Sequence, residues 1–132
     1  MALPSFEVST VLPVDPLRVY QAWLSSAEHS AFTGSPATID PVVGGQFTAW
    51  DDYISGATVE LVPFSRIVQR WRTTEFPPGA EDSLVSLTLE PDGCCGTRLT
   101  LQHTDIPEGQ DESYRQGWLD YYFEPMQRYF AE

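Results

Sequence analysis

The sequence predicts an α+β fold in which an antiparallel sheet wraps around one long C-terminal helix. Three patterns lead to this prediction: a strand followed by two short helices, a run of five further strands, and a terminal helix with a broad apolar face. Helices segregated from consecutive strands are typical of this fold class. The expected order is β-α-α-β-β-β-β-β-α with six strands in the sheet, and at 132 residues one domain over residues 1–132 is expected.

The N-terminal elements are predicted from β-branched residues and from helix caps. Phe6 to Leu12 is rich in β-branched and apolar residues and predicts a strand. Asp15 followed by Pro16 predicts a helix start, because aspartate caps free N–H groups and proline suits the first helical position. Ser26 is expected to cap a second short helix that ends near Gly34. The expected apolar face of the first helix consists of Leu17, Tyr20, Trp23 and Leu24.

A loop over residues 35–45 precedes five strand patterns. The predicted strands are Gln46 to Trp50, Gly56 to Val62, Arg66 to Thr73, Leu84 to Glu90 and Thr97 to His103. Asp92-Gly93 predicts a hairpin turn between the last two. Alternation along each strand separates an apolar face from a polar one. The apolar face is expected to contain Val59, Leu61, Ile67, Trp71, Val85, Leu87, Leu89, Leu99 and Leu101.

The terminal helix is expected from about Asp111 to Phe130. Two adjacent seams at helical spacing give it a wide apolar face. Pro125 lies inside the helix, removes a backbone hydrogen bond to Tyr121 and predicts a bend. The helix must therefore cover the apolar face of the sheet. Its seams are Trp118, Tyr122, Met126 and Tyr129, and Leu119, Phe123, Met126 and Phe130.

Two polar side chains, Gln69 and His103, fall on the apolar face of the sheet. A buried polar group without a partner costs about 1–3 kcal/mol, so each is expected to have one. One interpretation is that they bond each other, a tyrosine hydroxyl or a trapped water. The other is that they face a cavity and orient a small apolar ligand. The candidate ligand-binding residues are then Phe47, Gln69, Trp71, Leu87, Leu101, His103, Trp118, Tyr122 and Met126.

The aromatic residues also allow two interpretations: they form a cage around a ligand, or they belong to an ordinary core. Trp50 falls on the polar side of its strand and is expected under a loop, whereas the others fall on apolar faces. The aromatic set is Trp23, Phe32, Phe47, Trp50, Trp71, Trp118 and Tyr122.

Composition restricts the partners of the protein. The net charge is −12, and all seven cationic side chains are arginines. Nucleic acid and anionic membrane surfaces are excluded as expected partners, because both require a basic patch. No apolar run spans a membrane and no signal peptide is recognised, so a cytoplasmic location is expected. The acidic, lysine-free composition is compatible with a salt-rich cytoplasm and with GC-rich coding.

Signals for catalysis and cofactors are absent from the sequence. Cys94 and Cys95 are adjacent in a predicted turn and are expected to be reduced thiols. His29 is expected in solvent on the second short helix. No metal-ligand spacing, phosphate loop or dinucleotide fingerprint occurs. The sequence predicts no metal, no cofactor and no assigned catalytic residue, and leaves His103 beside Tyr122 or Gln69 as a proton-transfer candidate.

Several segments resemble the C-terminal domain of the activator of the heat-shock protein 90 ATPase. The resemblance covers the chain from about Phe6 to Phe130. The most specific segment is the Gly-Trp-x-x-Tyr-Tyr-Phe-Glu run over residues 117–124. The others are Ile67 to Arg72, the hairpin from Leu87 to Leu101, Ile106-Pro107, Ala31 to Thr33, Pro36 to Thr38, Gly44 to Phe47 and Ser55-Gly56.

This resemblance implies a helix-grip fold with a cavity between the sheet and the last helix. The wider superfamily includes START lipid-transfer domains, birch-pollen-type allergens and polyketide cyclases. Three functions follow as expectations: binding of a small apolar ligand, regulation of a heat-shock protein 90 ATPase as a co-chaperone, or cyclase- or hydrolase-like catalysis. In the eukaryotic activator the main chaperone contact is made by an N-terminal domain outside the part that this chain resembles.

Overall fold

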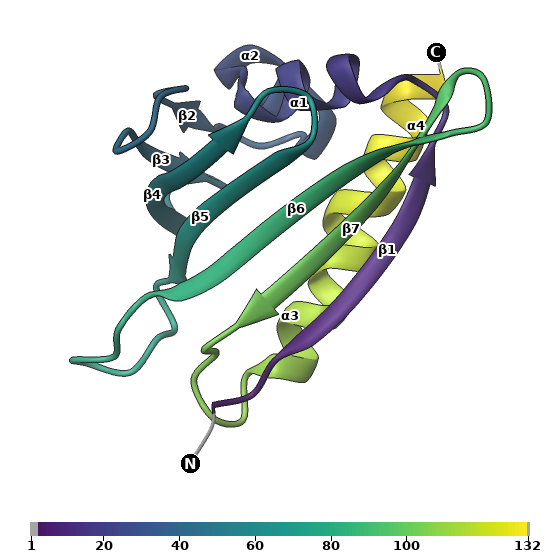
Figure 1. Cartoon of the computed structure of the whole chain (residues 1–132). Coiled ribbons are helices and arrows are strands. Elements are labelled where there is room, and N and C mark those ends of the chain that lie inside the picture. The colour runs from purple at the N-terminus through teal and green to yellow at the C-terminus, as the bar shows by residue number, and fades with distance from the viewer. Residues whose placement is uncertain (1–2, 132) are drawn as a thin grey trace.

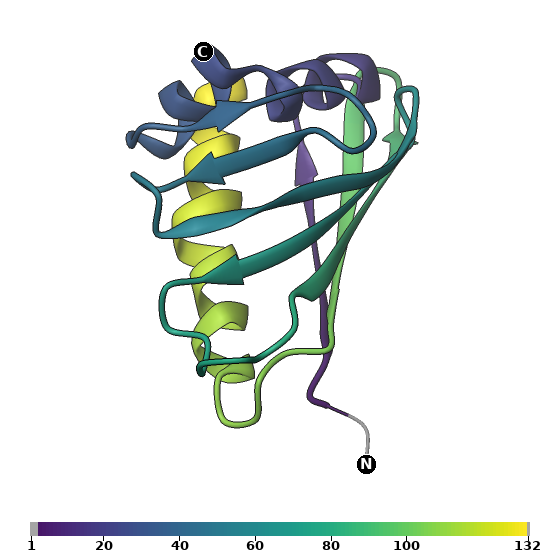
Figure 2. The ribbon, with the colours of Figure 1, turned by 90° about the vertical axis from the view of Figure 1, so that its left-hand side faces the viewer.

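The structure is a computed structural model that describes residues 3–131. Seven strands form one antiparallel sheet in the order β1-β7-β6-β5-β4-β3-β2. The sheet curves around the C-terminal helix, and two short helices cover one end of the interior (Figures 1 and 2). The elements are β1 (Phe6–Leu12), α1 (Pro16–Leu24), α2 (Ser26–Thr33), β2 (Thr38–Ile39), β3 (Gln46–Ala49), β4 (Ile54–Val62), β5 (Arg66–Thr73), β6 (Ser83–Asp92), β7 (Gly96–Thr104), α3 (Asp111–Trp118), the π-helical segment η1 (Leu119–Phe123) and α4 (Glu124–Ala131).

The predicted α+β helix-grip fold is confirmed, with seven strands in place of six. The additional strand, β2, has only two residues and pairs with β3 through Thr38↔Thr48 and Ile39↔Phe47. The sequence prediction placed it in a loop because a two-residue strand among prolines and glycines carries no alternation. The Ser26 hydroxyl stabilises β2 by accepting a hydrogen bond from the Ile39 N–H at 2.8 Å.

The predicted start of α1 is confirmed, but its apolar face is rotated. The Asp15 carboxylate accepts a hydrogen bond from the Arg18 N–H at 3.0 Å, and Pro16 is the first helical residue. Leu17 is 40% exposed. The buried face consists of Val19, Ala22, Trp23 and Leu24. Trp23 points into the interior, and this orientation of the helix leaves Leu17 at the surface.

The cap of α2 is Ser25, not Ser26. The Ser25 hydroxyl accepts a hydrogen bond from the Glu28 N–H at 3.2 Å. Gly34 ends the helix in a left-handed conformation, with φ of 79°, which glycine adopts without strain. The Ser26 side chain is therefore free to hold β2.

The apolar face of the sheet follows the predicted alternation except in β4. A register shift between Thr58 and Glu60 adds one residue to this strand, and such a bulge moves the following side chains to the opposite face. Val59, at the bulge, is 41% exposed, and Thr58 before it takes the inner position. Leu61, after the bulge, pairs with Ile67 and packs half-buried against the core, as predicted. The predicted inner residues of the longer strands are buried: Ile67, Trp71, Val85, Leu87, Leu89, Leu99 and Leu101.

Pro125 is accommodated by the π-helical segment directly before it. Proline has no N–H to donate to the carbonyl of Tyr121, four residues earlier. The Glu124 N–H donates instead to the carbonyl of Leu119, five residues earlier. The helix thus accommodates the proline through one π-helical turn, and π-bulges inside α-helices are frequent at functional sites. Within residues 3–131, no helix is both long and apolar enough to cross a membrane.

Candidate functional site

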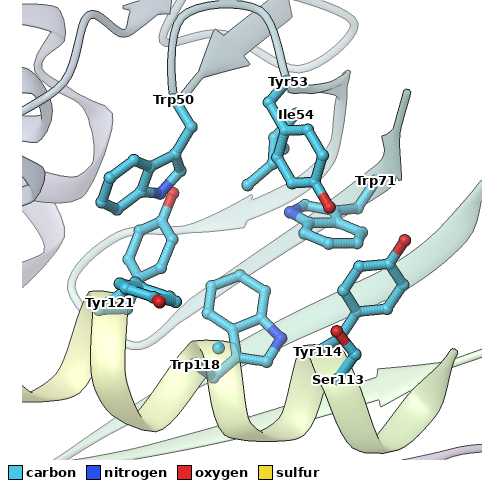
Figure 3. A pocket seen from close by; sticks show the side chains of 10 residues that line it. Trp50, Tyr53, Ile54, Trp71, Ser113, Tyr114, Trp118 and Tyr121 are labelled. Atoms are coloured by element: carbon cyan, nitrogen blue, oxygen red, sulfur yellow. The ribbon is translucent and has the colours of Figure 1, made fainter. Parts of the chain in front are cut away.

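A pocket lies between the C-terminal helix and the side of the sheet formed by β3, β4 and β5. Its volume is about 350 Å³, at the lower end of the range of small-molecule sites, about 300–1,000 Å³. Figure 3 shows six labelled aromatic rings around the hollow. We call it the aromatic pocket, and it is lined by Trp50, Tyr53, Ile54, Trp71, Ser113, Tyr114, Gly117, Trp118, Tyr121 and Tyr122.

The turn between β3 and β4 places one wall of the aromatic pocket. Trp50, Asp51 and Asp52 have φ of 54°, 54° and 70°, three left-handed residues in succession. Aspartate adopts this conformation more readily than most L-residues, but for Trp50 it costs about 1–2 kcal/mol, and such strain clusters at functional sites. The Asp51 N–H anchors the turn by donating to the carbonyl of Pro36 at 3.0 Å. The turn holds Trp50 against Tyr121, with ring centroids 5.8 Å apart.

A buried histidine fixes the orientation of Trp118. The Trp118 indole N–H donates to His103 Nδ1 at 3.1 Å, and His103 Nε2 lies 2.8 Å from the Ser83 hydroxyl. That hydroxyl donates to the carbonyl of Trp71 at 2.6 Å, so His103 must carry its proton on Nε2 and donate to Ser83. Burial lowers the pKa of His103 to about 3. The ring is therefore neutral and acts as the acceptor for Trp118.

A second buried histidine fixes Tyr122 in the same manner. His29 Nδ1 lies 2.9 Å from the carbonyl of Trp23, to which it donates, and Nε2 accepts from the Tyr122 hydroxyl at 3.0 Å. Burial lowers the pKa of His29 to about 4, partly opposed by the bond to Trp23. Burial also raises the pKa of Tyr122. The prediction of a solvated His29 is wrong: only 2% of the residue is exposed, because its helix packs over Tyr122.

Gln69 and His103 both point inward, but neither lines the aromatic pocket. The Trp23 indole N–H donates to the Gln69 carbonyl oxygen at 3.2 Å, and the Gln69 amide donates to the Thr58 hydroxyl at 3.3 Å. The partners of Gln69 and His103 are thus mainly tryptophan N–H groups and hydroxyls, and the two residues do not bond each other. His103, considered from the sequence as a proton-transfer group beside Tyr122 or Gln69, bonds neither of them, and the Tyr122 hydroxyl donates to His29.

The structure divides the nine candidate residues into two groups. Trp71, Trp118 and Tyr122 line the aromatic pocket. The other six lie in the filled part of the interior: Phe47, Gln69, Leu87, Leu101, His103 and Met126. Among the remaining lining residues, the sequence suggested only Trp50, as a member of the aromatic set. The other six come from the β3–β4 turn, the start of β4 and the N-terminal half of the last helix: Tyr53, Ile54, Ser113, Tyr114, Gly117 and Tyr121.

Gly117 is the sequence signal that could have located the pocket. Glycine inside a helix is about 1 kcal/mol less favourable than alanine, so its presence requires a reason. Close packing is not that reason, because a Cβ at this position would meet only Tyr121 Cδ2, at 3.9 Å. Gly117 lines the aromatic pocket, and its missing side chain leaves part of the hollow unfilled.

Polar groups gather at one rim of the aromatic pocket. The Tyr114 hydroxyl donates to the Gln110 side-chain oxygen at 2.6 Å and lies 2.7 Å from the Thr73 hydroxyl. The Tyr53 hydroxyl donates to the Glu75 carboxylate. Burial, followed by the bond to Glu75, raises the pKa of Tyr53 to about 12. These tyrosines are neutral at pH 7 and give the rim hydrogen-bonding capacity without charge.

The described part of the chain contains no group of three or more side chains able to hold a metal ion. Cys94 and Cys95 are free thiols at the exposed β6–β7 turn, with their sulfur atoms 2.9 Å apart. Neither lines the aromatic pocket. The titratable groups in the pocket lining are all tyrosines, so its chemistry is chiefly that of aromatic surface.

Comparison with known proteins places this architecture in a family. Residues 13–131 match the family model "Activator of Hsp90 ATPase homolog 1-like protein". A human relative, the activator of 90 kDa heat shock protein ATPase homolog 1, is 33% identical over 116 residues, 88% of this chain. A relative from Dictyostelium discoideum is 33% identical over 103 residues, 78% of this chain. The chain spans about a third of the human relative, 34% of its length.

Solved structures show the same fold. The structure of an HSP90 activator from Plasmodium falciparum has a TM-score of 0.89 at 24% identity, covering 96% of each chain. The Aha1 dimer from Colwellia psychrerythraea has a TM-score of 0.76 at 14% identity, covering 92% of each. Taken with the family model and the identity to the human relative, this chain belongs to the family of Activator of Hsp90 ATPase homolog 1-like proteins.

Proposed function

We propose that this chain is a binding domain that takes a small apolar ligand into the aromatic pocket. The observation that carries the proposal is Gly117, a glycine inside a helix whose missing side chain keeps the pocket open and serves no close packing. A helix that only had to cover the sheet would gain about 1 kcal/mol from alanine at this position. Glycine at this position therefore leaves the volume unfilled and lowers the stability of the helix relative to alanine.

The lining suits an apolar ligand because two residues of its wall bond their polar atoms to histidines outside the pocket. The Trp118 N–H and the Tyr122 hydroxyl are held by His103 and His29 behind the wall. A ligand therefore meets ring surface, and burial of apolar area contributes roughly 25 cal/mol per Å². The Ser113 side chain and the tyrosine hydroxyls at the rim would orient a single polar group of the ligand.

Filling the pocket tests this function. In Gly117→Leu the new side chain enters open space, so we expect a folded protein that no longer binds. Gln116→Leu adds the same side chain at the neighbouring exposed position and serves as the matched control. Small aromatic and aliphatic compounds are screened by thermal shift and by quenching of tryptophan fluorescence. If no compound stabilises the parent protein, or if Gly117→Leu binds as well as Gln116→Leu, the proposed function is wrong.

A second function, regulation of an Hsp90-type chaperone, is favoured by the family match over residues 13–131. The match covers only 34% of the human activator, so the activity of the whole protein is a proposal here. Such contact would occur in the cytoplasm, the location expected from the sequence. The test is the ATPase rate of the host chaperone with and without this protein, and an unchanged rate contradicts this function.

Catalysis has less support than either binding function. The acid–base candidate of the sequence, His103, lies behind the wall of the aromatic pocket and is bonded to Trp118 and Ser83. The residues that line the pocket include no histidine, carboxylate or lysine that could act as a base, so we propose no reaction.

A further inference from the structure

We propose that the aromatic pocket selects its ligand by charge and takes an apolar organic cation, such as a quaternary or protonated amine, in preference to a neutral compound or an anion of the same shape. This inference rests on the proposed function, because it names the chemical class of the ligand for the same site. It is carried by the composition of the walls, by the absence of basic groups among the lining residues, and by the charges that frame the mouth.

The walls provide the aromatic faces that attract a cation. Seven of the ten lining residues are aromatic, and the face of an aromatic ring carries negative charge density. The rings meet at angles: Trp118 and Tyr122 are tilted by 46° with centroids 4.7 Å apart, and Trp71 and Trp118 by 41° at 5.6 Å. These rings contact one another, so a compact cation would lie in the hollow in front of them, where it can contact more than one ring, as in aromatic cages for quaternary ammonium groups.

An anion would find no counter-charge inside the pocket. None of the ten lining residues is a lysine, an arginine or a histidine. Burying an unpaired ion in an apolar site is strongly unfavourable. A carboxylate or sulfonate head group is therefore disfavoured at this site, whereas a cation obtains compensation from the rings.

The segments that frame the pocket add a negative field at its mouth. Residues 50–54, 71–75 and 111–122 carry six carboxylates and two guanidinium groups. Both arginines are paired, Arg72 with Asp82 at 2.8 Å and Arg115 with Glu112 at 3.8 Å, so five of the six carboxylates have no ion-pair partner among the described residues. A cleft lined by one sign of charge concentrates ligands of the opposite sign. The six carboxylates belong to Asp51, Asp52, Glu75, Asp111, Glu112 and Asp120.

Glu75 is the carboxylate that the structure ties most directly to the site. It accepts the hydrogen bond of the Tyr53 hydroxyl, and Tyr53 lines the pocket. The backbone carbonyl of Glu75 also accepts a hydrogen bond from the Gln110 side chain at 2.9 Å. The carboxylate is thus held at the rim, where it can face the charged end of a bound amine.

Three probes of similar shape and different charge test the inference on the full chain. Benzyltrimethylammonium is the cation, neopentylbenzene its neutral carbon counterpart, and phenylmethanesulfonate the anion. Binding is followed by tryptophan fluorescence and by NMR shifts of the indole N–H groups. We expect the cation to bind about tenfold more tightly than the neutral probe, with no binding of the anion. Of the three probes, only the cation should bind more weakly as the salt concentration is raised.

The outcomes separate this inference from the proposed function. If the neutral probe binds as tightly as the cation or more tightly, or if the anion binds best, the charge preference is overturned and the apolar pocket stands. If none of the three binds, the charge preference is overturned, and the compound screen described above decides the proposed function. Glu75→Gln keeps a hydrogen-bond acceptor for Tyr53. We expect this substitution to lower the affinity for the cation about threefold and to leave the affinity for the neutral probe unchanged.

Glu90→Gln serves as the matched control for Glu75→Gln. It removes the same charge from the exposed end of β6 beside the β6–β7 turn, at a residue that does not line the pocket. We expect no change in the affinity of either probe. Equal effects of the two substitutions on the cation would overturn the part assigned to Glu75.

Discussion

The two sides of one aromatic wall differ in how completely they are packed. Trp71, Trp118 and Tyr122 separate the aromatic pocket from a filled interior on the side of His103, His29 and Met126. On the filled side, Met126, Leu101 and His103 are fully buried, and no buried side-chain nitrogen or oxygen in the described chain lacks a partner. On the pocket side, Gly117 leaves space and Tyr121 is 60% exposed.

This difference shows that one helix performs two tasks along its length. Its C-terminal half, α4, carries Met126 and Phe130 into the core and stabilises the sheet. Its N-terminal half, α3 with η1, presents rigid rings and a glycine to a hollow. The two neutral histidines connect these two parts. His103 accepts the Trp118 indole N–H and His29 accepts the Tyr122 hydroxyl, both on the filled side of the wall. The filled interior thereby orients the wall of the site.

The largest effect is expected from protonating the two histidines of the filled interior. Both have pKa values lowered by burial, to about 3 for His103 and about 4 for His29, against about 6.5 in the unfolded chain. Below pH 6.5 the unfolded state binds the protons first, so stability falls as pH is lowered toward 4. Between pH 7 and pH 5 we expect a loss of about 2 kcal/mol per histidine, about 4 kcal/mol together.

Urea unfolding at pH 7, 6 and 5 measures this dependence. His29→Gln and His103→Gln keep one donor and one acceptor each, and each should remove about half of the pH-dependent loss. If stability stays constant over this range, or if both substitutions leave its pH dependence unchanged, the histidines are not buried as neutral rings.

Truncation of the core residue of α4 comes next. Met126→Ala removes a fully buried side chain, and buried methionine to alanine substitutions cost about 2–5 kcal/mol. We expect a loss of about 3 kcal/mol in the free energy of unfolding in urea. A loss below about 1 kcal/mol would show that the filled side is as loosely packed as the pocket side.

A smaller effect of opposite sign is expected on the pocket side. Gly117→Ala should raise the free energy of unfolding by about 1 kcal/mol, because alanine favours the helix and its Cβ enters open space. Chemical unfolding together with the affinity for a bound probe checks this, and the affinity should fall as the pocket narrows. Destabilisation would mean that the glycine serves packing and would remove the main support for the proposed function.

The smallest effect on stability is expected at the mouth of the pocket. Tyr121→Ala truncates a side chain that is 60% exposed, and surface substitutions usually change stability by less than about 0.5 kcal/mol. Probe affinity should nevertheless fall, because Tyr121 forms the mouth with Trp50. Phe64→Ala, at another exposed aromatic outside the pocket, is the control and should change neither property. A large loss of stability in Tyr121→Ala would place this ring in the core.

Local signals in the sequence were sufficient for most of the fold. The Asp15-Pro16 start, the Asp92-Gly93 hairpin and the alternation in β5, β6 and β7 depend on residues within a few positions of each other, and the structure agrees with them. β2 and the bulge at Thr58 were missed, because a two-residue strand and a single inserted residue leave no periodic pattern.

The candidate site was predicted only in part for the same physical reason. The sequence identified Trp71, Trp118 and Tyr122 as inward aromatics, since their positions follow helix and strand periods. It placed His29 in solvent, because its burial depends on Tyr122, 93 positions along the chain. A hollow is defined by volume that no side chain fills, and periodicity reports the direction of a side chain but not the space beyond it.

The sequence by itself therefore determined the order of the elements, the inward faces of the longer strands and the family. Only the tertiary structure decided that Gln69 and His103 accept hydrogen bonds from tryptophan N–H groups, and that the aromatic pocket lies beside Gly117 and Trp50. The reason is that faces are fixed by local backbone geometry, whereas hydrogen-bond partners and unfilled volume are fixed by how distant elements meet.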